Sequence, residues 1–91
     1  ITRANFAMVN QSVLILVTGE HSLATRYLGE RSRFADVRGD SYAYNSIATN
    51  VDRGIMSAER ITGDFRPTDP VSGAEALLII RDLQNALRLE F

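Results

Sequence analysis

The sequence predicts a mainly α-helical fold of three or four helices, with a helical hairpin in its C-terminal half. Apolar residues recur at steps of three and four over residues 41–62, which is the spacing of one helix face. A second stripe of this kind covers residues 73–90, and two prolines separate the stripes. The 91 residues are enough for a single small domain, 1–91, with an N-terminal helical region at 3–36 and the hairpin at 41–90.

Residues 3–18 fit two interpretations. Phe6, Val9, Val13 and Leu16 follow helical spacing, whereas Ser12–Thr18 is a β-branched apolar run before Gly19, which is typical of a buried strand. We expect a helix, because the rest of the pattern is helical and a lone strand has no partner. A strand over residues 12–18 is the alternative.

A second helix is expected after a break at Gly19–Ser22. Ser22 is suited to cap its start, and the apolar face continues through Phe34 and Val37. Gly29 lies inside this segment and costs about 1 kcal/mol relative to alanine. Gly39 is expected to end the helical region.

The strongest helix prediction covers residues 41–62. Asp40 or Ser41 can cap its start. Gly54 interrupts the stripe at a cost of about 1 kcal/mol, less than the 1.5–3 kcal/mol that one buried Ile or Val contributes. The helix is therefore expected to continue to Gly63 along the stripe of Tyr44, Ile47, Val51, Ala58 and Ile61.

The last helix is expected over residues 73–90. Ser72 and Glu75 match the S-x-x-E capping box. One side of this helix carries Ala76, Ile79, Ile80, Leu83, Ala86 and Leu87. Two narrow stripes joined by about ten residues predict an antiparallel, coiled-coil-like hairpin.

The turn Pro67-Thr68-Asp69-Pro70 lies between the two predicted helices of the hairpin. It resembles the P-x-x-P turn of the hairpin subunits that build type III secretion needles. The resemblance covers these four residues and a helix–turn–helix outline, and it implies a hairpin architecture.

Narrow apolar seams on a small domain predict that a partner covers them, because a chain of this size buries only about 60–65% of its unfolded surface. The predicted function is a small non-catalytic helical interaction module, which self-associates as a homo-oligomer or docks on a protein partner as an assembly subunit. The expected interface residues are Tyr44, Ile47, Val51, Ile55, Ala58, Ile61, Ile80, Leu83 and Leu87.

Groups for catalysis are scarce. The chain has no Cys and one His, and it lacks a glycine-rich phosphate loop and any metal-ligand spacing. We therefore expect no catalytic residue, no cofactor and no metal. The alternative is a small enzyme subunit or a ligand-binding α+β domain with a pocket near Glu20 and His21.

Nucleic acid is not an expected partner, because the formal net charge is −1 and acids accompany the arginine-rich stretch Arg26–Arg38. The longest apolar run, Val13–Val17, is far shorter than the ~20 residues of a membrane span. No signal-peptide layout is present. The location is left unknown, with the cytoplasm favoured. Since the chain begins at Ile1, we expect upstream processing or trimming.

Overall fold

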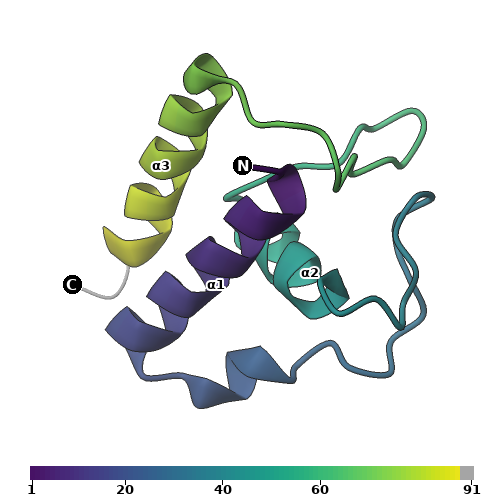
Figure 1. Cartoon of the computed structure of the whole chain (residues 1–91). Helices are drawn as coiled ribbons and strands as arrows, with labels where there is room; N and C mark the ends of the chain where they lie inside the picture. The colour runs from purple at the N-terminus through teal and green to yellow at the C-terminus, as the bar shows by residue number, and fades with distance from the viewer. Residues whose placement is uncertain (89–91) are drawn as a thin grey trace.

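Helix α1 spans Arg3–Thr18 and lies at the centre of the fold (Figure 1). The computed structural model describes residues 1–88. Oγ1 of Thr2 accepts a hydrogen bond from the backbone N–H of Asn5 at 3.2 Å, which caps the helix. Gly19 ends it in the left-handed conformation, with a φ of 73°. Residues 12–18 therefore lie in a helix as expected, and the structure does not contain the alternative strand there.

The segment after α1 is mostly irregular. A short 3₁₀ helix, His21–Ala24, is its one helical turn in the described chain, so the helix expected from Ser22 to Val37 is wrong. The backbone N–H of Tyr27 donates to Oδ1 of Asn45 at 2.8 Å rather than to a helical carbonyl. Gly29 then adopts a φ of 82°, which breaks helical geometry. The predicted helical region 3–36 is reduced to α1 and this turn.

Helix α2 spans Tyr44–Asp52 and is much shorter than the predicted helix 41–62. Gly54 adopts a φ of 71°, so it ends the helix and does not merely weaken it. The backbone N–H groups of Ile55 and Met56 both turn back to the carbonyl of Asn50, at 2.9 and 3.3 Å. Ile55 and Met56 consequently enter the core from a turn.

Helix α3 spans Gly73–Arg88, and the prediction for residues 89 and 90 lies outside the described residues. The backbone N–H of Glu75 donates to Oγ of Ser72 at 3.1 Å, as in a capping box. α3 packs against α1 and not against α2, and α1 and α3 run side by side although they are far apart in the sequence (Figure 1). The predicted antiparallel hairpin of residues 41–62 and 73–90 is therefore wrong.

The proline turn pairs with the start of α1. The backbone N–H groups of Arg3 and Ala4 donate to the carbonyls of Asp69 and Pro67, both at 2.9 Å. Thr2 and Pro70 form an isolated antiparallel bridge, and residues 1–88 contain no β-strand. The turn that resembles a needle-subunit turn thus attaches the chain to α1 and does not reverse a helical hairpin.

The core lies between α1, α2 and the long connections. The largest fully buried apolar side chains are Leu14, Leu23, Tyr44, Ile47, Ile55 and Phe65. The interface between α1 and α2 also contains a buried polar seam, in which every buried side-chain N or O atom of the described residues has a partner. The described chain is thus mainly helical, and long ordered connections complete its core.

Candidate functional site

The most prominent surface feature is a set of large apolar side chains on two neighbouring helices. On α1, Val9 is 53% exposed and Leu16 is 84% exposed. On α3, Leu77 is 71% exposed and Ile80 is 44% exposed. We call these four residues the α1–α3 face.

Helical periodicity separates two flanks of α3. At 3.6 residues per turn, Leu77 and Ile80 lie roughly opposite Glu75 and Asp82. The two acids line a hollow with residues of the connection after α2. Leu77 and Ile80 are not among the residues that line this hollow, so they belong to the outer flank of α3.

The hollow lies between the inner flank of α3 and residues 54–60, and its volume is about 590 Å³. Its apolar part is formed mainly by Phe34, Val51, Ile55, Met56, Leu78 and Ile79. Arginine side chains and acidic side chains both surround this apolar part, so the charges beside it are mixed. The volume is that of a ligand pocket, but mixed charges select no one ligand class.

Arg3 joins α1 to α3 and to the connection beside the hollow. Its Nε donates to the carbonyl of Phe65 and its Nη2 to the carbonyl of Ser57, both at 2.7 Å, and its Nη1 pairs with Glu75. Its guanidinium lies 4.5 Å from the centre of the Phe65 ring. Burial lowers the pKa of Arg3, and the charge of Glu75 opposes this shift. Arg3 thus holds α3 in place through charge-assisted bonds.

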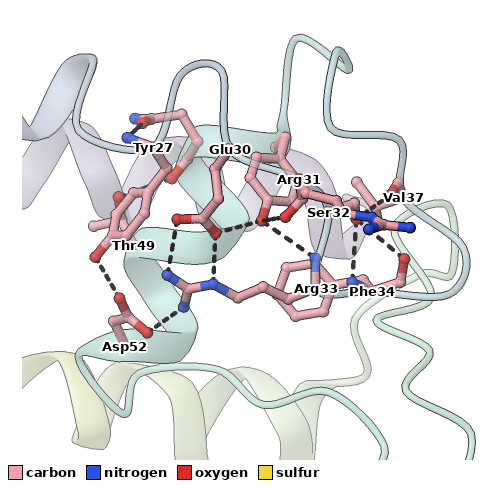
Figure 2. Close-up of polar contacts among 11 residues, drawn as sticks. Tyr27, Glu30, Arg31, Ser32, Arg33, Phe34, Val37, Thr49 and Asp52 are labelled. Carbon is pink, nitrogen blue, oxygen red and sulfur yellow. Dashed lines mark hydrogen bonds and ion pairs between the residues drawn. The ribbon is translucent and has the colours of Figure 1, made fainter.

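A second cluster joins the irregular segment to α2, and Figure 2 shows its contacts. Arg33 donates from Nε to Oε1 of Glu30 at 2.6 Å and from Nη1 to Oδ1 of Asp52 at 2.5 Å. The hydroxyl of Tyr27 donates to Oδ2 of Asp52 at 2.5 Å, and the hydroxyl of Tyr44 donates to Oε1 of Glu30 at 2.7 Å. One arginine therefore bridges two carboxylates, each of which also accepts a tyrosine hydroxyl.

These contacts explain the ionisation of the cluster. Hydrogen bonds from Arg33 and Tyr44 lower the pKa of Glu30. Burial alone would raise the pKa of Asp52, but hydrogen bonds from Tyr27 and Arg33 outweigh it and the pKa is lowered. Burial and the neighbouring carboxylates raise the pKa values of both tyrosines. Each group is held in its ordinary charge state, which indicates a stabilising role.

The alternative function predicts a pocket near Glu20 and His21, which lie where α1 ends and the 3₁₀ helix begins. Oε2 of Glu20 lies 3.4 Å from Nη2 of Arg53, while His21 is exposed at the start of the 3₁₀ helix. Neither residue lines any of the three hollows on this protein that we describe by volume, of about 590, 450 and 480 Å³.

The expected interface residues occupy three different environments. Tyr44, Ile47 and Ile55 are buried in the protein's own core, so this conformation does not offer them to a partner. Half-buried positions that pack against the core are Val51, Ala58, Leu83 and Leu87. Ile61 is 94% exposed in a turn, and Ile80 is exposed on α3. Only Ile80 belongs to the α1–α3 face.

Sequence reasoning missed Val9, Leu16 and Leu77 as surface residues. The signal was present in Val13–Val17, where apolar residues surround the helix axis and exceed what one buried face can hold. A helix of this kind has apolar side chains on more than one side, of which the core covers only one.

Comparison with known proteins gave no match: no family model, no curated protein and no solved structure is similar to this chain at a significant level. Among residues 1–88, no helix is both long and apolar enough to cross a membrane. In the same range, no group of three or more His, Asp or Glu side chains is placed to hold a metal ion. The surfaces described above are therefore the basis for a functional proposal.

Proposed function

We propose that this protein is a small helical interaction module, which binds another protein chain through the α1–α3 face as one subunit of a larger assembly. The observation that supports it is the exposure of Leu16 and Leu77 on adjacent helices. Isolated exposed apolar residues are common, and this face is singled out because four of them lie on two helices that pack together.

The energy available at this face suits a reversible contact. Burial of a leucine side chain contributes about 1.5–3 kcal/mol, so Leu16 and Leu77 together contribute about 3–6 kcal/mol before the entropic cost of association. Val9 and Ile80 add smaller amounts because they are already partly covered. A micromolar complex needs about −8 kcal/mol, so these four side chains alone support only a weaker contact, and further contacts must supply the rest.

Replacement of Leu16 and Leu77 by glutamine tests the proposal, with Leu28→Gln as the matched control. Leu28 is 65% exposed but belongs to the irregular segment and to neither α1 nor α3. Light scattering and affinity capture should show that the wild type and the control retain the same self-association or the same partner. Retention of all binding by the Leu16→Gln/Leu77→Gln variant would contradict the proposal.

A further inference from the structure

The charged groups on the outer flank of α3 have one sign. Arg81 and Arg88 lie within about 40° of Leu77 around the helix axis, because they follow it by four and eleven residues. Both arginines are exposed. The acids of α3 within the described chain, Glu75 and Asp82, lie on the flank that faces the hollow. Nε of Arg81 is 3.9 Å from Oδ1 of its neighbour Asp82, beyond hydrogen-bond distance.

Helix α1 adds apolar surface without charge. Arg3 is its one charged residue and is buried, and residues 4–18 contain none. The α1–α3 face is therefore apolar on α1 and bordered by arginine on α3. A partner that covers it needs apolar side chains with carboxylates beside them.

The remainder of the protein has the opposite sign. The whole chain carries a formal charge of −1, so the part without Arg81 and Arg88 carries −3. A second copy that packs symmetrically through this face would bring like-charged arginines toward each other. Charge complementarity thus favours a different chain.

The geometry of the face fits a helix. α1 and α3 run side by side (Figure 1), and a third helix can pack against such a pair. Val9 and Leu16 are seven residues apart and Leu77 and Ile80 three apart, so each pair repeats with the helical period. An amphipathic helix can contact both pairs at once.

We infer that the α1–α3 face binds an acidic amphipathic helix of another protein, with its apolar residues against the four apolar side chains and its carboxylates beside Arg81 and Arg88. This inference depends on the proposed function and specifies its partner. It assigns affinity to the four apolar residues and charge selectivity to the two arginines.

Three synthetic 18-residue peptides test this directly. Each has leucine at i, i+3, i+4 and i+7 of a repeating pattern. The polar positions are mainly glutamate in the first peptide, glutamine in the second and lysine in the third. Binding is followed by the backbone amide NMR shifts of the full chain, titrated at low and at high salt. We expect the glutamate peptide to bind about fivefold more tightly than the lysine peptide, with the largest shifts at the α1–α3 face and a smaller preference at high salt.

Arg81→Glu is the decisive variant, and Arg31→Glu is its control. Arg31 is also exposed but belongs to the irregular segment after α1. Arg81→Glu should remove or reverse the preference for the glutamate peptide, and Arg31→Glu should leave it unchanged. Arg81→Gln, which introduces no negative charge beside Asp82, should remove the preference without reversing it.

The inference is overturned if the peptides bind equally or if the lysine peptide binds more tightly. It is also overturned if no peptide, at concentrations up to about 1 mM, shifts the amide signals of the α1–α3 face. A symmetric dimer through this face would also overturn it. In that case the Leu16→Gln/Leu77→Gln variant would still lose association, so the proposed function would survive. If the Leu16→Gln/Leu77→Gln variant kept its association and no peptide bound the face, both the proposed function and this inference would be contradicted.

Discussion

Asn10 of α1 donates from Nδ2 to Oδ1 of Asn50 of α2 at 2.9 Å, and both side chains are buried. Nδ2 of Asn50 in turn donates to the carbonyls of Ala7 and Ser46, at 2.9 and 2.7 Å. Nearby, Oγ of Ser46 donates to Oε1 of Gln11 at 2.5 Å. These bonds fix the register of α1 on α2, since a shift of either helix would leave buried amides unpaired.

Asn10→Ala should destabilise the protein by about 1–3 kcal/mol, because it leaves Oδ1 of Asn50 buried without its donor. Urea unfolding measures the change. Asn85→Ala, at an exposed position of α3, should stay within about 0.5 kcal/mol of wild type. If both variants unfold at the same urea concentration, the seam does not stabilise the fold.

Arg3→Lys should lower the free energy of unfolding by about 2–4 kcal/mol, because lysine cannot reach two carbonyls and Glu75 together. Amide exchange in α3 should accelerate more than amide exchange in α2, since Glu75 anchors α3 to α1. Hydrogen exchange with mass spectrometry checks both. Equal acceleration of the two helices would show that Arg3 does not anchor α3 in particular.

Stability should decrease on acidification through the Arg33 cluster. The pKa values of Glu30 and Asp52 are lower in the folded protein than their ordinary values of 4.5 and 3.8. A lowered folded pKa gives a contribution that is complete above the unfolded pKa and lost as the pH falls through the folded one. The loss should therefore begin near pH 4.5 and continue below pH 3.8.

The control for this pH dependence is Glu30→Gln/Asp52→Asn, which removes both titrating groups. Thermal unfolding between pH 7 and pH 3 should show a smaller loss in the double variant than in wild type. An identical loss would mean that other carboxylates determine the acid response.

Two glycines should respond oppositely to alanine. A Cβ atom on Gly39 would lie 2.8 Å from the backbone oxygen of Glu30, so Gly39→Ala should cost about 1–3 kcal/mol. A Cβ on Gly73 would meet nothing within 4 Å, and Gly73→Ala should stabilise the start of α3 by about 0.4–1 kcal/mol. The melting temperatures of the two variants measure these effects. A higher melting temperature for Gly39→Ala would contradict the close approach of residue 39 to the backbone of Glu30.

The sequence predicted the helical class and the presence of α1 and α3. For α3 the capping box and the periodicity agree. For α1 helical spacing competed with a strand over residues 12–18, and the caps at Thr2 and Gly19 emerged only from the structure. The prediction failed where glycine geometry overrides the apolar spacing. Gly29 and Gly54 both adopt positive φ, so the stripes that contain them become turns. Several of their apolar residues, such as Phe34 and Ile47, are still buried, because spacing reports burial and not the hydrogen bonds of the backbone, whereas Leu28 and Ile61 are exposed.

The candidate site was predictable only in part. Ile80 was expected at the interface and is exposed, whereas Tyr44 and Ile47 were assigned to a seam that is the protein's own core. Which side of a helix the core covers depends on tertiary packing. α3 packs on α1 instead of α2, and this places Leu16 and Leu77 at the surface. A single sequence does not contain that choice in its local pattern.

Hydroxyl-radical footprinting of the assembled protein, compared with the isolated chain, tests the α1–α3 face most directly. Leu28 and Ile61 are exposed elsewhere and serve as internal references. We expect oxidation of Leu16 and Leu77 to fall several-fold in the assembly while both references react as before. Unchanged oxidation of Leu16 and Leu77, with protection at Leu28 or Ile61 instead, would contradict it.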